Sequence, residues 1–277
     1  MKALKKGSSG KEVKLLQGWL NVLGHYDGKI DGHYGMLTAE AVKGYQACHG
    51  LKVDCCAGAI TQKNMGFMPV KDPKIVVLRI PFSKIITASV LLKDKQKYSV
   101  GSLAKAFGMN VVVNGGFFDR RTLQNVTDLI VDGVLNNGGN YTDKGLAFGN
   151  DFQKYGIYPS TTADNKGKPV DFMGGVPALI QGGKKAVDMK GIPQSIYTQI
   201  TRRIGTGVWE DAFCIMLSLN NCSLEAMVQE GLNQGLIFLK GNDGGGSQSV
   251  YFGTDTIIPT DGRAIPSGEG LLVRKEV

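Results

Sequence analysis

Two glycine-rich segments contain the residues best suited to chemistry. Segment 243–247 reads Asp-Gly-Gly-Gly-Ser, and segment 114–116 reads Asn-Gly-Gly. Glycines let backbone N–H groups approach an anion closely, and the serine hydroxyl and asparagine amide add further donors. Arg203 and Arg263 belong to the same set, because a guanidinium can bind two phosphate oxygens at once. These residue types predict a site for a phosphate-bearing substrate.

The histidines restrict the chemistry. All three, His25, His33 and His49, lie among the first 50 residues, so the rest of the chain has none. A Ser-His-Asp or Cys-His hydrolase and a histidine-rich zinc site are therefore excluded there. We predict no cofactor and no metal ligand set, while a divalent cation near Asp243 and Asp132 stays open.

The hydropathy pattern divides the chain between residues 69 and 74. Apolar residues at helical spacing predict a helix over 13–23, a second helix with Thr38 as its N-cap, and a third between 58 and 66. After Pro73, β-branched residues alternate as in strands. The fold class is therefore expected to be α+β, with a small three-helix bundle in residues 1–69 and a mixed α/β sheet domain in residues 74–277. The predicted strands are 75–80, 85–92, 111–113, 129–131, 177–180, 213–217, 237–239 and 271–273, and the predicted helices of this domain are 99–107 and 223–233.

The first part resembles the three-helix peptidoglycan-binding domains. That family has an Asp-Gly, a nearby Gly, a Thr and an Ala-Val-x-x-Tyr/Phe-Gln helix in order. The chain matches the pattern at Asp31, Gly32, Gly35, Thr38, Ala41, Val42, Tyr45, Gln46 and Leu51. The resemblance implies peptidoglycan or a related wall polymer as partner. The aromatic and histidine side chains near the loop are candidate glycan contacts: His25, Tyr26, His33 and Tyr34.

The second part resembles the phosphodiester glycosidases, which include the uncovering enzyme that removes N-acetylglucosamine from a sugar-phosphate diester. The marker blocks of that family occur in order as VVVNGGFFD (111–119), LIVDG (129–133), GGVPALIQGG (174–183), Arg203 with Gly207, NDGGGSQS (242–249) and Arg263. The chain departs from the family at residues 241–242, where Gly-Asn replaces the usual Asn-Leu.

This second resemblance implies hydrolysis of a glycosyl-phosphodiester bond in wall-linked sugar phosphates. Asp243, Asn114 and Arg203 are the expected catalytic residues, with Asp243 as nucleophile or acid/base. Ordinary glycosidases use two carboxylates. The candidates for a partner of Asp243 are Asp119, Asp132, Asp211 and Glu269. The residues expected to bind substrate are Gly115, Gly116, Gly244, Gly245, Gly246, Ser247 and Arg263.

Composition sets the remaining expectations. The net charge of +8 attracts anionic partners, but no basic motif indicates nucleic acid and no apolar run is long enough for membrane insertion. The N-terminus has no apolar signal sequence, so an enzyme of the bacterial cell wall would be released by lysis, as a phage endolysin is, or would have lost its signal. Two other functions stay open: a peptidoglycan glycosidase that cleaves the glycan itself, and a non-catalytic wall-binding protein.

Overall fold

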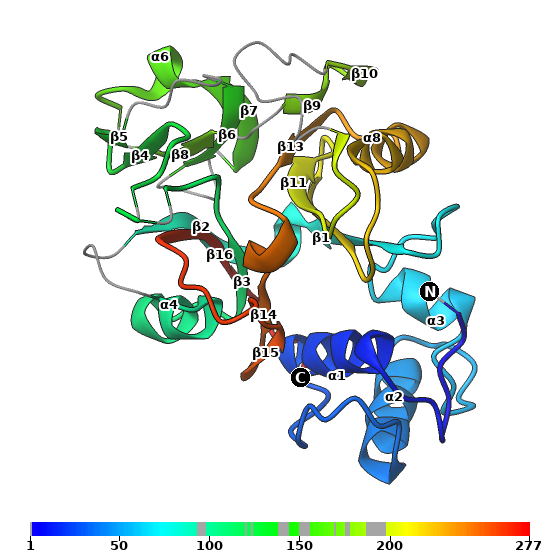
Figure 1. The fold of residues 1–277 in the computed structure, drawn as a ribbon. Coiled ribbons are helices and arrows are strands. Elements are labelled where there is room, and N and C mark those ends of the chain that lie inside the picture. The colour runs from blue at the N-terminus through cyan, green and yellow to red at the C-terminus, as the bar shows by residue number, and fades with distance from the viewer. Residues whose placement is uncertain are drawn as a thin grey trace.

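The computed structural model describes residues 2–92, 98–119, 121–122, 124–137, 144–149, 156–168, 170–174, 178–186 and 198–277. Three helices at the N-terminus precede a region of antiparallel sheets with further helices, which is the expected α+β class (Figure 1). In chain order the elements are α1 (Lys11–Leu23), α2 (Met36–Cys48), α3 (Ala59–Asn64), β1 (Ile75–Pro81), η1 (Phe82–Lys84), β2 (Ile85–Leu92), α4 (Val100–Phe107), β3 (Val111–Asn114), β4 (Leu129–Val131), β5 (Val134–Asn137), β6 (Lys144–Gly149), β7 (Ile157–Thr161), α6 (Thr162–Asn165), β8 (Val170–Gly174), β9 (Ala178–Gln181), β10 (Lys184–Lys185), β11 (Ile204–Val208), β12 (Ala212–Ser218), α8 (Leu224–Asn233), β13 (Phe238–Gly241), η2 (Gly245–Ser247), β14 (Val250–Phe252), β15 (Asp255–Ile258) and β16 (Ser267–Val273).

A buried glutamine organises the N-terminal helices. The side chain of Gln17, on α1, is fully buried, and its Nε2 donates to Asp31 Oδ1 at 3.0 Å and to Thr38 Oγ1 at 3.1 Å. Its Oε1 accepts from the N–H of Gly32 at 2.8 Å. The sequence predicted Thr38 as the N-cap of α2, and this prediction is wrong. Gly35 caps the helix, and the threonine hydroxyl faces inward. The motif residues thus hold the loop between α1 and α2 in place.

The strands of the described residues form three sheets. A six-stranded sheet has the order β1-β12-β11-β13-β9-β10, and the two five-stranded sheets have the orders β15-β14-β3-β16-β2 and β5-β4-β8-β6-β7. Apolar residues of α8 pack on the first sheet, and those of α4 pack on the second. Each predicted strand overlaps an observed one, although residue 177 lies outside the described residues. The sequence missed β5 to β8, β10, β11, β14 and β15.

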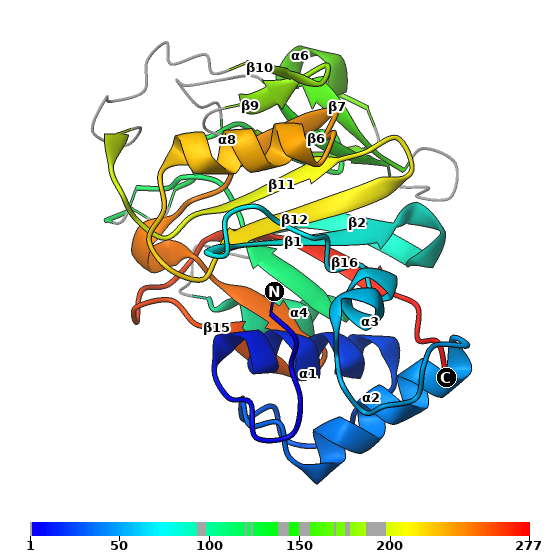
Figure 2. The same ribbon diagram turned by 90° about the vertical axis from the view of Figure 1, so that its right-hand side faces the viewer.

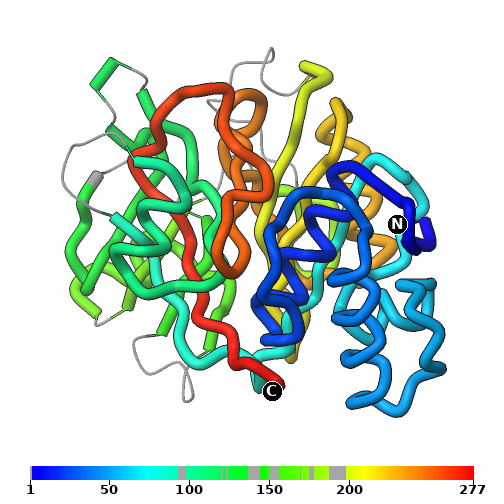
Figure 3. Tube along the Cα trace, turned by 90° about the horizontal axis from the view of Figure 1, so that it is seen from below, coloured from blue at the N-terminus to red at the C-terminus, as the bar shows by residue number. Residues whose placement is uncertain are grey.

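The helices and the sheets share one apolar core. α1 lies against β14 and β15, as the view from below in Figure 3 shows. The rings of Trp19 and Phe252 meet edge to face with centroids 5.6 Å apart. A Cβ added to Gly18 would lie 2.6 Å from the Cδ1 of Ile257, so a larger residue would require the Ile257 side chain to move. The division at residues 69–74 stays a prediction as a domain boundary.

Both ends of the sheet region bond back to the helices. The N–H of Met68 donates to Val77 O at 2.8 Å, which pairs the connector with the first strand. At the other end, the N–H of Glu276 donates to Leu23 O at 2.8 Å. The C-terminal tail accordingly runs to the end of α2 in Figure 2.

The shared core predicts a single unfolding transition. Phe252→Ala should lower the free energy of unfolding by about 3–5 kcal/mol, because it leaves a cavity beside Trp19. Urea denaturation followed by both tryptophan fluorescence and circular dichroism measures this loss, and the two signals should change at one midpoint. Ile60→Ala is the control, since Ile60 is 77% exposed and its removal should change stability by less than about 0.5 kcal/mol. Two separate midpoints would contradict the shared core.

Candidate active site

The two glycine-rich segments meet directly. Segment 243–247 follows β13, and segment 114–116 ends β3 and begins the loop that follows it. The N–H of Asp243 donates to Gly115 O at 3.0 Å, and Asn114 Nδ2 donates to Asp243 O at 2.7 Å. The carboxylate-bearing residue Asp243 is half-buried. The structure therefore brings together the residues that the sequence placed in one site.

Asn114 holds this junction in place. Its side chain is 1% exposed, and its Oδ1 accepts from the N–H of Ser249 at 2.9 Å while its Nδ2 bonds to Asp243. Its backbone oxygen accepts from Asn242 Nδ2 at 2.7 Å. Both polar ends of the amide are thus used within the protein. In this geometry Asn114 positions the Asp243 backbone.

Arg203 lies inside the protein just before β11. It is 6% exposed, and its Nη2 donates to Gln199 O at 2.6 Å. Burial lowers the pKa of its guanidinium, an effect that the nearby Cys222 thiol partly opposes. Its backbone oxygen accepts from Gln248 Nε2 at 2.9 Å, which ties β11 to the residues that follow segment 243–247.

Arg263 is more exposed than Arg203 and packs against Gly246. Its Nε and Nη2 donate to the carboxylate of Asp261 at 2.6 and 2.5 Å. The hydrogen bond to Asp261 is the largest of the effects that raise the pKa of Arg263, and the negative charge of Asp243 acts in the same direction. The Arg263–Asp261 ion pair therefore packs against Gly246 of segment 243–247, and Asp261 balances the charge of the guanidinium.

The glycines of the site are required by close packing. Gly245 has a φ of 58°, and a Cβ on Gly244 would lie 2.7 Å from Arg202 O. A Cβ on Gly246 would overlap the paired side chains of Asp261 and Arg263. In the other segment, the neighbours that would be overlapped are Ser267 Oγ for Gly115 and Thr127 Oγ1 for Gly116. These glycines thus have a packing role whether or not they also contact substrate.

Three backbone N–H groups of segment 243–247 already have hydrogen-bond acceptors within the protein. The N–H groups of Asp243, Gly245 and Ser247 donate to Gly115 O, Arg202 O and Gly244 O respectively. The Ser247 side chain is fully buried, and its Oγ has no hydrogen-bond partner within the described ranges. The expectation that this hydroxyl binds substrate is therefore not met in this conformation.

A buried ion pair supports the site, and sequence reasoning missed half of it. Lys240 Nζ, on β13, lies 2.5 Å from Glu269 Oε1, on β16, and both side chains are 0% exposed. Lys240 Nζ also donates to Asn242 Oδ1 at 2.9 Å, and Asn242 in turn bonds to Asn114. Burial lowers the pKa of Lys240, which the adjacent Glu269 charge opposes. The sequence signal was a lysine inside the apolar run LIFLKG, which can be buried only with a partner.

The structure gives three of the candidate carboxylate partners roles in surface turns or pairs. Asp211 pairs with Arg79 and its side chain is 70% exposed. Asp119 accepts the N–H groups of residues 121 and 122, and Asp132 occupies a left-handed turn with a φ of 51°. Glu269 is the candidate joined to segment 243–247, through Asn242, but Lys240 already balances its charge.

Three of the four candidate glycan contacts in the helical part are buried. Tyr26 is 6% and Tyr34 2% exposed, and the side chain of His25 is 4% exposed. The interpretation of these three residues as exposed contacts is therefore wrong. His33 is exposed, as expected.

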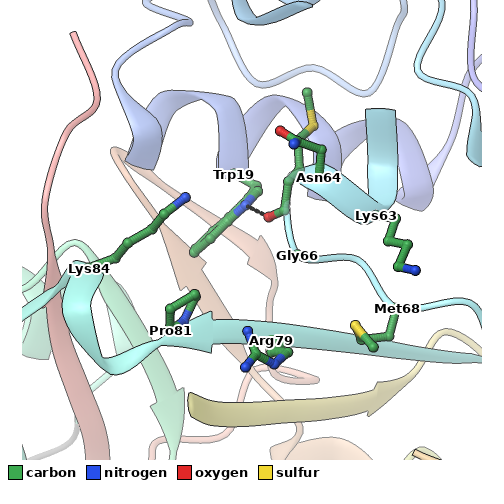
Figure 4. Close-up of a pocket in the computed structure, with 9 residues that line it drawn as sticks. Trp19, Lys63, Asn64, Gly66, Met68, Arg79, Pro81 and Lys84 are labelled. Carbon is green, nitrogen blue, oxygen red and sulfur yellow. Dashed lines mark hydrogen bonds between the residues drawn. The ribbon is translucent and has the colours of Figure 1, made fainter. Parts of the chain in front are cut away.

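A cavity of about 280 Å³ lies elsewhere, at the seam between the helices and β1 (Figure 4). Its edge is closed by Trp19, whose Nε1 donates to Met65 O at 2.7 Å. Of its cationic lining residues, Arg79 pairs with Asp211 and Lys84 with Glu276. None of the predicted site residues lines it.

Sequence similarity defines the class of the first part. Residues 9–65 match the family described as "Putative peptidoglycan binding domain". The chain therefore carries an N-terminal peptidoglycan-binding domain. No helix in the described part of the chain is long and apolar enough to cross a membrane.

Two of the relatives are named as cell-wall enzymes, and each is similar to this chain over only a short stretch. The spore cortex-lytic enzyme of Bacillus cereus is 42% identical over 60 residues, which are 22% of this chain and 23% of that enzyme. The N-acetylmuramoyl-L-alanine amidase of Mycobacterium tuberculosis is 39% identical over 59 residues, 21% of this chain and 14% of the amidase. The chain thus spans less than a quarter of the length of these relatives.

Solved structures show the fold of the sheet region. The catalytic domain of zebrafish N-acetylglucosamine-1-phosphodiester alpha-N-acetylglucosaminidase superposes with a TM-score of 0.59 at 19% identity, covering 72% of this chain and 76% of that one. A hypothetical protein from Synechocystis gives a TM-score of 0.62 at 14% identity, covering 74% of this chain and 61% of the other. At these identities the likeness is one of fold.

The buried ion pair predicts strong coupling between its two residues. Lys240→Met should lower the free energy of unfolding by about 3–5 kcal/mol, because it leaves the Glu269 carboxylate buried without its counter-ion. The double variant Lys240→Met/Glu269→Leu should lose less than the sum of the single variants Lys240→Met and Glu269→Leu. Urea denaturation of the four proteins measures the coupling. Additive losses would show that the pair does not act as a unit.

Proposed function

We propose that this protein is a cell-wall-targeted hydrolase that cleaves a glycosyl-phosphodiester bond in wall-linked sugar phosphates. The observation that supports it most is the direct junction of segments 114–116 and 243–247, which brings Asp243 and Asn114 together, with Arg263 packed against Gly246. A likeness of fold to an enzyme whose name specifies a sugar phosphodiester substrate adds to this argument. The N-terminal domain would hold the site at the wall and raise the local concentration of substrate.

The chemistry follows from the charges of the site. Water adds to the anomeric carbon, and the bond from that carbon to the phosphate oxygen breaks with its electron pair remaining on the phosphate. Asp243 either takes the proton from this water or attacks the carbon first and forms a glycosyl intermediate that water then hydrolyses. The departing phosphate is a weak base, so it needs little protonation, and the guanidinium of Arg263 can stabilise its charge.

The other residues act through Asp243. Asn114 fixes the Asp243 backbone with a 2.7 Å hydrogen bond, and the Lys240–Glu269 pair fixes Asn242 one residue earlier. Arg203 is buried and holds the neighbouring backbone. We therefore assign Asn114 and Arg203 as positioning residues and Asp243 as the catalytic residue.

Asp243→Asn tests the assignment. Purified Gram-positive walls incubated with wild type should release sugar or sugar phosphate, detected by mass spectrometry, and Asp243→Asn should lower the rate by about 100-fold or more. Asp255→Asn is the matched control, because Asp255 is an exposed β15 residue whose carboxylate bonds only locally, to the N–H of Thr256 at 2.7 Å. It should release product at the wild-type rate, and all three proteins should sediment with the walls.

Each other outcome selects a different function. Release of muropeptides with new reducing ends would indicate a peptidoglycan glycosidase. Wall binding without any soluble product from wild type would indicate a non-catalytic wall-binding protein.

A further inference from the structure

A second cluster of chemically active side chains lies where the C-terminal tail meets the ends of α1 and α2, outside the site described above. His25 follows the C-terminal cap of α1, His49 caps the C-terminus of α2, and Glu276 lies in the C-terminal tail. The tail reaches these helix ends in Figure 2. Three segments far apart in the sequence thus converge on one point.

The ligand atoms of these residues are close together. Glu276 Oε2 lies 3.2 Å from His49 Nε2 and 3.8 Å from His25 Nε2, and one such atom from each residue lies within 4.8 Å of the others. Ligands of a tetrahedral zinc ion with bonds near 2.1 Å are separated by about 3.4 Å. The His49–Glu276 pair already has this spacing, and the remaining pairs need shifts of about 1.5 Å or less.

Two of these atoms are buried without a hydrogen bond. His25 Nε2 and Glu276 Oε2 are both inaccessible and make none with any residue that the structure describes. A buried imidazole nitrogen and carboxylate oxygen that face each other without a shared hydrogen bond are costly. A cation between them would satisfy both.

The surrounding contacts orient the ligands as in known zinc sites. His49 Nδ1 lies 2.8 Å from Tyr45 O, so an N–H at Nδ1 donates to this carbonyl and leaves the lone pair on Nε2, toward Glu276. The His49 ring also stacks on Tyr45 with centroids 4.0 Å apart. Lys84 Nζ lies 2.5 Å from Glu276 Oε1, which fixes one carboxylate oxygen and leaves the other for a metal.

We propose that His25, His49 and Glu276 bind a zinc ion, with a water molecule as the fourth ligand. Two imidazoles and a carboxylate suit zinc better than calcium or magnesium, which prefer oxygen ligands. The ion would clip the C-terminal tail to the ends of α1 and α2. This role is structural and does not depend on the proposed activity.

Zinc titration of the 277-residue protein tests the site. Chelator-treated wild type should bind one zinc ion per chain by isothermal titration calorimetry and should melt roughly 5–10 °C higher when free zinc is a hundredfold above Kd. Glu276→Gln and His49→Gln should each weaken zinc binding at least tenfold. His33→Gln is the control, since His33 is an exposed histidine of the same domain, and it should bind as wild type does.

Two further measurements keep the result unambiguous. Cobalt bound to wild type should show the visible absorption of a tetrahedral site, a readout that needs no variant. The thiols of Cys55 and Cys56 are competing zinc ligands, so the titration is repeated with Cys55→Ser/Cys56→Ser. Absence of zinc binding by wild type, loss of binding in the double serine variant, or full binding by Glu276→Gln would each overturn the proposal.

Discussion

Two opposite charges with no exposure to water, those of Lys240 and Glu269, constrain the centre of the sheet region. An unpaired charge at such a depth is very costly, so β13 and β16 must stay in the relative positions that keep these two side chains in contact. The strands belong to different sheets, and Asn242 and Asn114 carry the network from this pair to segment 243–247. The position of the Asp243 backbone is therefore set by contacts between sheets.

The glycines of this loop also serve contacts between distant parts of the chain. A sequence of three successive glycines suggests backbone that is open to an anion, yet here three N–H groups of segment 243–247 already bond within the protein. Gly244 and Gly246 allow other parts of the chain to pack against the loop. Gly246 in particular leaves room for Arg263, which Asp261 holds by two hydrogen bonds.

Local patterns in the sequence were sufficient for much of the fold. β2 and β4 match their predicted ranges, because each is a short run of apolar and β-branched residues. Ser99 and Ser223 mark the beginnings of α4 and α8 with their own side-chain caps. Thr38 failed as a cap for a reason outside its own helix, since its hydroxyl accepts from Gln17 of α1.

What the sequence could not provide was contact between distant residues. The order of the motif blocks grouped Asn114 with Asp243, but nothing local pairs Lys240 with Glu269 or brings Glu276 to His25 and His49. Those contacts follow from strand register and from the path of the C-terminal tail. Hydrophobic periodicity shows which face of a helix or strand is buried. These clusters depend on which buried faces pack against each other.

The packing of α1 on β14 and β15 affects how a wall-bound molecule can work. With Trp19 and Phe252 in one core, the peptidoglycan-binding domain cannot swing on a flexible linker, so the Asp243 loop keeps a fixed distance and direction from that domain. Under the proposed activity, such a molecule would reach new substrate only by detaching from the wall and binding again. Its rate on an intact wall would then be limited by detachment, and tighter binding would make it slower.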